Sequence, residues 1–459
     1  MGSVGLSFGS ATSGQGIDVA STVTQILANY QQVETPWKNQ LSALQSQDAV
    51  LSTLGTQVST LSTDIQNLTD AMGVFAEKSG SSSDTNVLEL TSASSMAAAG
   101  THAITVQSLA QTSSAASAAV GASDALTGGV TIQVGSGQQY TVNVGDSSTA
   151  ATISGLAAAI NAAGIGVTAS VLTDTNGSRL SVVSNTNGAA GTLTVSGTLT
   201  DASAAGGAQS VSFTQVQAGL DASLEVDGVS ITSASNTVTN AIPGVTFQLL
   251  SANPNEQVQV IIANDNSTIE SSVSTFVNDY NALMKSITGQ EGNDSSGNAE
   301  PLYGNPVTAQ LQNMIEGALN SAPASGNVTS LYSLGITANA DGTLSLNTDT
   351  LDSVLNTNFN DVVGFFQNAG SFGVSFANTL NNLGTSNPTG VLALTQKMNS
   401  SEESTLNDDI SNEESRLGDM KTQLTLELNQ VNETLQSIPS QLNYVNQLYD
   451  AITGYNEKS

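Results

Sequence analysis

Apolar residues recur at every seventh position from residue 23 to residue 72, and further apolar residues fill the companion positions between them. This pattern is typical of helices that pack along an apolar seam. A proline inside a helix removes a hydrogen bond and clashes with the preceding turn, so Pro36 predicts a break. We therefore predict two helices, at roughly residues 17–35 and 37–75. The recurring residues are Val23, Tyr30, Trp37, Leu44, Leu51, Val58, Ile65 and Met72.

The C-terminal segment repeats this pattern over residues 410–452. Its companion series moves over by one position along the segment, which suits a long helix that changes partners along its length. We expect Pro439 to kink or end this helix. The recurring residues are Ile410, Leu417, Leu424, Val431, Ile438, Val445 and Ile452.

Between these segments the pattern changes to short apolar alternations bounded by turn residues, which is typical of strands. SLEVDGVSIT (223–232) carries Asp-Gly at its centre and predicts a hairpin, because this dipeptide favours tight turns. SLGITANADGTLSLN (333–347) predicts a second Asp-Gly hairpin. Residues 87–111 predict two strands around a turn at Gly100. The middle of the chain is therefore expected to be rich in β-structure.

Helical periodicity returns at STFVNDYNALMKSI (274–287), where apolar residues follow the spacing of one helix face. We expect this helix to pack its apolar face on the long N-terminal helix. The two terminal segments then come back together, and the β-rich middle is an insertion. The predicted fold class is α+β multidomain, with a helical-bundle or coiled-coil leg formed by the N- and C-terminal segments and two nested β-rich head domains inserted between them.

The composition shifts along the chain predict five parts. We expect the first and the last part to become ordered when other copies, or the helices of a partner, complete the bundle. The parts are an N-terminal coiled-coil segment (1–36), a helical leg (37–78 with 268–395), a β-rich head (79–111 with 218–267), an inserted head-tip domain (112–217) and a C-terminal coiled-coil segment (396–459).

The charge of the chain restricts its partners. Eight Lys and Arg against 38 Asp and Glu give a net charge of −30, and Arg179 is the only basic residue between residues 79 and 284. No basic stripe is available for phosphates or anionic lipids, so we expect neither nucleic acid nor membrane as a partner. The chain has no cysteine, no apolar run long enough to span a membrane and no ordinary signal peptide at its start, so export would need another route.

Nothing in the sequence predicts catalysis, a cofactor or a metal ion. His102 is the single histidine and cannot build a ligand cluster or a triad without cysteine. The acidic pairs at residues 402–414 read as a solvated helix face. NDNSTIE (264–270) and GNDSSGNAE (292–300) resemble calcium loops only superficially, because neither matches the twelve-residue pattern.

Several stretches resemble the flagellar filament cap family, also called hook-associated protein 2, in the right order along almost the whole chain. The stretches are GIDVASTVTQIL (16–27), FAEKSGSSSDTNVLELTSASSMAAAGTHAITVQSLAQ (75–111), LAAAINAAGIGVTASV (156–171), VDGVSITSASNTVTNAIPGVTFQLL (226–250), FVNDYNALMKSI (276–287) and LGITANADGTLSLNTDTLDSVL (334–355).

This resemblance implies a structural protein, not an enzyme, at the distal tip of the bacterial flagellum. It implies export by flagellar type III secretion and an extracellular ring of roughly four to six copies that caps the filament. The ring would promote flagellin folding and insertion and prevent loss of flagellin monomers. The implied partners are other copies, flagellin and a flagellar export chaperone.

We expect the terminal segments to carry the seam for self-association or flagellin contact. The seam residues are Val19, Val23, Ile26, Tyr30, Val33, Leu424, Val431, Leu435, Ile438, Leu442, Val445 and Ile452. A flagellin-like subunit or a hook–filament junction protein remains an alternative, because both combine terminal helices with a β insertion. A surface protein that mediates cell adhesion is a further alternative.

Overall fold

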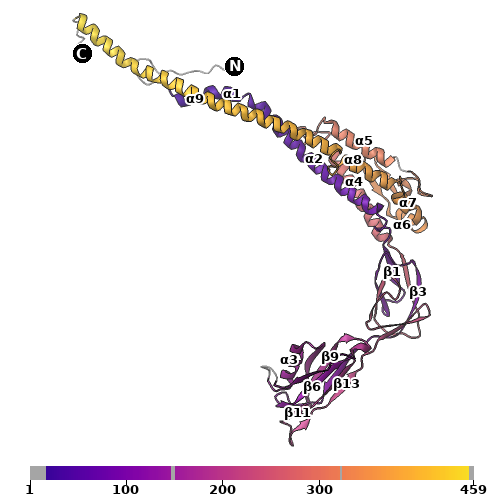
Figure 1. Ribbon diagram of the computed structural model, residues 1–459. Helices are drawn as coiled ribbons and strands as arrows, with labels where there is room; N and C mark the ends of the chain where they lie inside the picture. Colours follow the sequence, from indigo (N-terminus) through magenta and orange to yellow (C-terminus); the bar gives the residue numbers. More distant parts are fainter. Residues whose placement is uncertain (1–16, 146–149, 321–322, 454–459) are drawn as a thin grey trace. The chain divides into compact units, whose positions relative to one another are not determined.

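The structure is a computed structural model that describes residues 17–145, 150–320 and 323–453. The chain forms two compact units, divided after Thr69 and after Ile269. The segments before and after the insertion form one helical unit, and the middle segment forms a β-rich unit (Figure 1). The predicted α+β multidomain class is therefore confirmed. The five-part division by residue number is finer than these two units and stays a prediction.

The helical unit contains eight of the nine α-helices of the described residues, a short 3₁₀ turn and a two-stranded hairpin. Its elements are α1 (Val19–Gln31), α2 (Glu34–Thr69), α4 (Asn266–Gly289), α5 (Pro306–Asn320), η2 (Leu331–Leu334), β19 (Ile336–Ala338), β20 (Leu344–Leu346), α6 (Thr348–Thr357), α7 (Phe359–Gln367), α8 (Phe372–Leu383) and α9 (Val391–Thr453).

The core of this unit combines the apolar side of α2 with an aromatic cluster. Leu51, Leu54 and Leu61 of α2 are fully buried, as expected from their seven-residue and companion spacing. The Phe276 ring of α4 meets the Phe376 ring of α8 edge to face, with centroids 5.5 Å apart. Aromatic pairs in this geometry stabilise a core beyond their buried area. The chain is poor in aromatic residues, and it concentrates several of them where α4, α7 and α8 meet.

The partners of α4 extend beyond the expected one. Its apolar face is buried, and its contacts with α2 include a hydrogen bond of 2.9 Å from Gln57 Nε2 to Ser286 Oγ. The face also meets α8 through Phe276, and Tyr280 donates a hydrogen bond to the carbonyl of Gly342 beside β20. The expectation that this face packs on the N-terminal helix alone is therefore incomplete. A short sequence window does not contain these non-local partners.

Two proline expectations have different outcomes. Pro36 lies in the first turn of α2, where its missing N–H is tolerated, and the chain breaks between α1 and α2 just before it. Pro439 lies inside α9, and the helix continues to Thr453, so the expectation that Pro439 ends it is wrong. The surrounding residues are at least partly exposed, which lets water satisfy the carbonyl that loses its partner.

The β-rich unit contains one large sheet and three smaller ones. The large sheet has the strand order β15-β14-β3-β18-β1-β2-β17-β16, and each of these strands is antiparallel to its neighbours. Its strands are β1 (Lys78–Ser82), β2 (Leu88–Ala93), β3 (Gly100–Ser108), β14 (Ala222–Val226), β15 (Val229–Ser233), β16 (Thr237–Thr239), β17 (Val245–Leu249) and β18 (Val258–Asn264).

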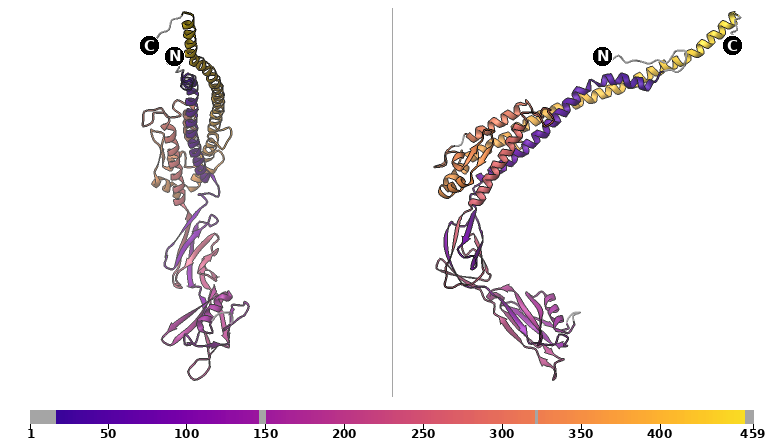
Figure 2. Two further views of the ribbon diagram at one scale, coloured as in Figure 1. Left: turned by 90° about the vertical axis from the view of Figure 1, so that its left-hand side faces the viewer. Right: turned by 180° about the vertical axis from the view of Figure 1, so that it is seen from behind.

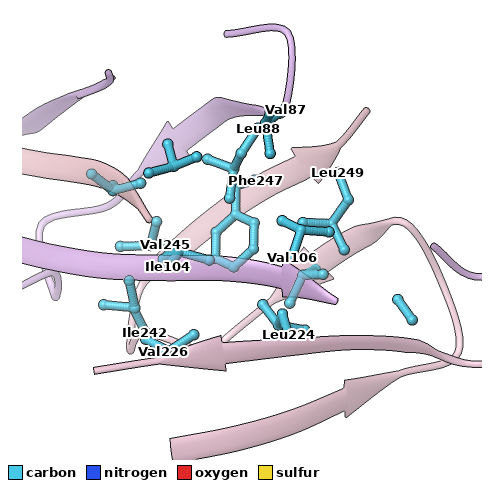
Figure 3. Packing of buried hydrophobic residues seen from close by; sticks show 14 of the residues in the cluster. Val87, Leu88, Ile104, Val106, Leu224, Val226, Ile242, Val245, Phe247 and Leu249 are labelled. Atoms are coloured by element: carbon cyan, nitrogen blue, oxygen red, sulfur yellow. The ribbon is translucent and has the colours of Figure 1, made fainter. Parts of the chain in front are cut away.

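Alternating residues of these strands share one core. Phe247 of β17 is fully buried, and Figure 3 shows its ring at the centre of the cluster. Val238 of β16 and Val226 of β14 lie near opposite ends of the strand order, yet they join the same cluster. The sheet therefore curves around a single apolar interior, as the twist of β-sheets allows.

The hairpin at Asp227-Gly228 is confirmed. Val226 of β14 pairs with Val229 of β15, which leaves a two-residue turn. Both turn residues have positive φ, 49° for Asp227 and 83° for Gly228, as tight hairpin turns require. The expected pair of strands around Gly100 is wrong in its turn, because Gly100 begins β3 and the turn precedes it. β2 and β3 do not pair with each other, since each pairs with distant strands.

The segment between β3 and β14 folds around a separate apolar cluster that includes Leu156, Ile132 and Leu180. Helix α3 packs beside strands of this segment, and sheets β13-β4-β9-β8, β10-β6-β7 and β12-β11-β5 complete it. The elements are β4 (Thr112–Ser117), β5 (Leu126–Thr127), β6 (Gly129–Val134), β7 (Tyr140–Asn143), α3 (Ile153–Ala163), β8 (Val167–Asp174), β9 (Gly177–Asn187), η1 (Ala189–Gly191), β10 (Leu193–Gly197), β11 (Thr200–Asp201), β12 (Gln209–Ser210) and β13 (Phe213–Gln217).

Candidate assembly surface

Helix α1 lies antiparallel along α9. The backbone N–H of Ile17 donates a hydrogen bond of 2.8 Å to Asn432 Oδ1, and thirteen residues later Tyr30 lies under the Arg416 guanidinium. Residue numbers therefore rise along α1 as they fall along α9. Figures 1 and 2 show the two helices side by side.

A small apolar cluster holds α1 in this position. Val23 and Leu27 of α1 and Leu417 of α9 are buried there. The half-buried residues around them are Val19, Met420, Leu424 and Leu428. Asp18 caps the N-terminus of α1, because its side chain accepts a hydrogen bond of 3.0 Å from the Ser21 N–H. A helix of 13 residues is marginal by itself, so this contact supplies much of the stability of α1.

Basic residues concentrate where α1 ends and α2 begins. Lys38 Nζ lies 2.7 Å from Glu34 Oε2 and 3.0 Å from Glu414 Oε1, which joins α2 to α9. The hydrogen bonds that Lys38 donates, first to Glu34 and then to Glu414, raise the pKa of Lys38. Arg416 bonds to Glu413 in a two-pronged pair, which lowers the pKa of the Glu413 carboxyl, and its guanidinium lies 6.0 Å from the Tyr30 ring centroid. Lys38, Glu414 and Arg416 are about half exposed, so solvent screens these pairs and each contributes little to stability.

The structure places the predicted seam residues in two different environments. Val19, Val23, Ile26 and Leu424 are buried or half-buried, and all except Ile26 belong to the α1–α9 cluster. Tyr30 and Val33 are 43% and 50% exposed. The remaining six lie further along α9, where Leu435 and Ile438 are half-buried and Val431, Leu442, Val445 and Ile452 are exposed.

Four residues of the α1–α9 contact were missing from the predicted seam. They are Leu27, Leu417, Met420 and Leu428. Leu417 and Leu428 already stood in the heptad pattern, and Leu27 follows Val23 by four residues, which places both on one helix face. The sequence therefore carried a signal for them, but it did not indicate which part of α9 would meet α1.

From Val431 onward, α9 presents a row of apolar side chains that are exposed or half-buried. The row repeats at intervals of four and three residues, which is the spacing of a coiled-coil seam. Its exposed fraction reaches 59% at Val445, 63% at Tyr449 and 79% at Ile452. We call these residues the distal row. Its members are Val431, Leu435, Ile438, Leu442, Val445, Tyr449 and Ile452.

The two stretches that resembled calcium loops have structural roles. Asp265 caps α4, because its carboxylate accepts hydrogen bonds from the hydroxyls of Ser267 and Thr268 and from the Thr268 N–H. The Asp294 carboxylate accepts from the N–H groups of Ser296 and Asn298 within its own turn. These bonds lower the pKa of both carboxyls. Among residues 17–145, 150–320 and 323–453, no group of three or more His, Asp or Glu is placed to hold a metal ion.

The single histidine braces a hairpin. His102 Nδ1 on β3 lies 2.7 Å from Asp227 Oδ2, and the other oxygen of Asp227 accepts from the Ala103 N–H. The bond to His102 is the main cause that lowers the pKa of Asp227. None of the helices in the described part of the chain is long and apolar enough to cross a membrane.

Two family models match this chain. The model for the N-terminus of flagellar hook-associated protein 2 matches residues 15–113, and the model for its C-terminus matches residues 219–440. Together they cover most of the chain.

Curated relatives and a solved structure agree with these matches. The B-type flagellar hook-associated protein 2 of Pseudomonas aeruginosa is 29% identical over 246 residues, which are 47% of this chain and 50% of that protein. The flagellar hook-associated protein 2 of Escherichia coli K12 is 30% identical over 230 residues, which are 46% of this chain and 48% of that protein. The matches span about half the length of these relatives.

The crystal structure of the D1-D2-D3 domains of the flagellar cap protein FliD from Escherichia coli is similar to this chain, with a TM-score of 0.55 and 26% identity. The similarity covers 76% of this chain and 99% of that one. This chain belongs to the flagellar hook-associated protein 2 family.

Proposed function

We propose that this chain caps the distal tip of the bacterial flagellar filament as an oligomeric ring of roughly four to six copies. The ring promotes the folding and insertion of flagellin and prevents the loss of flagellin monomers. In this proposal the chain is exported through the flagellar type III apparatus, with a dedicated chaperone, and acts outside the cell. Family membership supports the proposal, since the relatives are named as hook-associated or cap proteins.

The distal row is the observation that carries the proposal. A row of seven apolar side chains along a helix is unusual on a surface that stays in water. From Asn432 to Thr453 the row extends for about 30 Å, given a rise of about 1.5 Å per residue. Helices from other copies or from flagellin would bury it by knobs-into-holes packing.

A charge placed within the distal row tests this role. Val445→Glu puts a carboxylate at an exposed apolar position, and Gln447→Glu adds the same charge about half a turn away on the same helix. Neither change affects a described contact, so both variants should fold normally. In cells that lack the natural chain, we expect Val445→Glu to abolish filament growth and Gln447→Glu to support it. Equal growth with both variants would contradict the proposal.

Immunogold electron microscopy with an antibody against residues 112–217 tests the location. Gold at distal filament tips supports the cap. Gold along the filament shaft would indicate a flagellin-like subunit, and gold at the hook junction would indicate a connector. Gold over the cell surface without filament label would indicate an adhesin.

A further inference from the structure

The helical unit contains a groove that the proposed cap function does not use. The groove lies between α5 and β19 and holds about 740 Å³, a size typical of ligand pockets. Glu316 and Leu319 of α5 form one wall, and consecutive residues from Ile336 to Ala340 form the other. Tyr280 of α4 lies at its base, and Tyr332 lies at its rim with 76% of its surface exposed. We call it the α5–β19 groove.

The outer edge of β19 is open for pairing at Ala338, which is exposed, whereas Ile336 is buried. The Asn339 N–H donates a hydrogen bond of 2.8 Å to the Thr343 carbonyl, and the Asn347 N–H donates one of 2.9 Å to the Gly335 carbonyl. Since antiparallel pairs alternate, the backbone groups of Ile336 and Ala338 point away from β20. In the described part of the chain this sheet has only two strands, so no third strand meets that edge.

The opposite edge of the hairpin is closed. The Leu344 N–H donates 2.6 Å to Asn281 Oδ1, and Asn281 Nδ2 donates 2.8 Å to the Leu344 carbonyl. The Asn281 side chain thus replaces a neighbouring strand on β20. An exposed strand edge is a template for main-chain pairing, and only the β19 edge of this hairpin remains available for it.

The groove is rich in acceptors and has no cation. Glu316 Oε1 accepts a hydrogen bond from Gln312, and the carbonyl of Gly342 accepts from Tyr280. Glu316 Oε1 also lies beside Gly342, which lines the groove together with Tyr280, and burial followed by the Glu316 charge raises the pKa of Tyr280. None of the described lining residues is Lys, Arg or His. At the tip of the hairpin, hydrogen bonds from Thr343 lower the pKa of Asp341, and the charge of Lys285 adds to this effect.

We propose that the α5–β19 groove binds an extended segment of a partner protein, which pairs with the edge of β19 and places a Lys or Arg side chain against Glu316. The apolar walls at Leu319 and Tyr332 receive neighbouring side chains of the segment. Exposed tyrosines are frequent anchors of such contacts. This proposal concerns a function other than capping, and the groove could bind a partner whether or not the chain forms a ring.

The described residues of a second copy do not supply the segment. Its basic residues on helices lie on α2, α4 and α9, and none of these helices is extended. Lys78 lies on β1 and Arg179 on β9, and both strands already pair on their two sides. Within the described residues, no segment is therefore extended, unpaired and basic at once, and Lys458 lies outside them. The proposed partner is a different polypeptide.

A labelled peptide tests the proposal on the full chain. The probe is a terminally blocked peptide of alternating Thr and Val with a central Arg, and the control peptide has a central Glu. We expect fluorescence anisotropy to show saturable binding of the Arg peptide, and hydrogen exchange at the Ala338 amide to slow when it binds. No saturable binding up to about 1 mM, or equal binding of the Glu peptide, would overturn the proposal.

Two variants separate the charge from the edge. Glu316→Gln should weaken binding about tenfold or more, whereas Glu291→Gln, which removes an exposed charge outside the groove, should not. Ala338→Pro removes an outward N–H and leaves the ladder to β20 intact, so it should abolish binding. Unchanged binding of the peptide to Glu316→Gln would refute the charge contact, and unchanged binding to a folded Ala338→Pro would refute the main-chain pairing. Either result would overturn the proposal.

Discussion

Replacing Asp64 with Asn should stabilise the helical unit at neutral pH and leave its stability unchanged in mild acid. Asp64 on α2 faces Asp279 on α4, and within the described residues its buried Oδ2 accepts no hydrogen bond. Burial raises the pKa of Asp64 from 3.8 to about 6, and the hydrogen bond to Asp279 and the charge of Asp279 add to the effect. Two carboxylates this close oppose each other when both are ionised.

The sign of the pH dependence follows from this direction. A carboxyl with a raised pKa binds its proton more tightly in the folded state, so its contribution is most favourable below pH 3.8 and is lost as the pH rises to about 6. A rise of the pKa from 3.8 to about 6 corresponds to a loss of at most about 3 kcal/mol of unfolding free energy once the pH exceeds about 6. Because the side chain is partly exposed, solvent screening reduces this, and we expect about 1 kcal/mol.

Urea unfolding followed by far-UV circular dichroism measures this difference. Near pH 7.5 the Asn variant should exceed the natural chain by about 1 kcal/mol, and near pH 4 the two should agree. Asp408→Asn removes an exposed carboxylate from α9 and serves as the control without such a pH dependence. A gain independent of pH, or a variant that is less stable near pH 7.5, would refute the carboxyl pair as the cause.

Two further substitutions test the packing of each unit. Leu27→Ala should destabilise the attachment of α1 to α9 by about 2–4 kcal/mol. Hydrogen exchange should become faster in α1 and stay unchanged in α4. Equal exchange rates in α1 of the variant and the natural chain would contradict this. Gly228→Ala should destabilise the β-rich unit by about 1–2 kcal/mol in thermal unfolding, because φ is 83° there. Gly418→Ala, at an open helical position, should instead stabilise α9 by up to about 1 kcal/mol. If both glycine substitutions were destabilising, the positive φ of Gly228 would not be the cause of its effect.

The sequence predicted the helices well where their periodicity was long, but it did not predict which apolar positions find a partner. Val23 and Val445 stand in the same kind of seven-residue series, yet Val23 is buried and Val445 is 59% exposed. Periodicity shows which face of a helix is apolar. Whether another helix lies there depends on distant parts of the chain or on other molecules. Only the structure separated the α1–α9 contact from the distal row.

The strands show a related limit. β14 and β15 were expected from the Asp-Gly turn between them, whereas β1 (Lys78–Ser82) has no apolar residue and gave no such signal. β1 forms because β18 and β2 supply hydrogen bonds on its two sides. Similarly, the alternation within residues 87–111 indicated two strands but not their partners. Pairing in sheets depends on neighbours that are distant in sequence.

The net charge of −30 explains how the distal row can stay exposed in a free chain. Burial of the row favours association, but copies that approach each other repel through their excess of carboxylates. Lys38 and Arg416 lie at the other end of the α1–α9 contact and already bond to carboxylates of their own chain, so they offset little of this repulsion. Association is therefore favoured where the concentration of helices is high and salt screens the charge. The same helix can thus remain separate after synthesis and pack once it reaches an assembly of other helices.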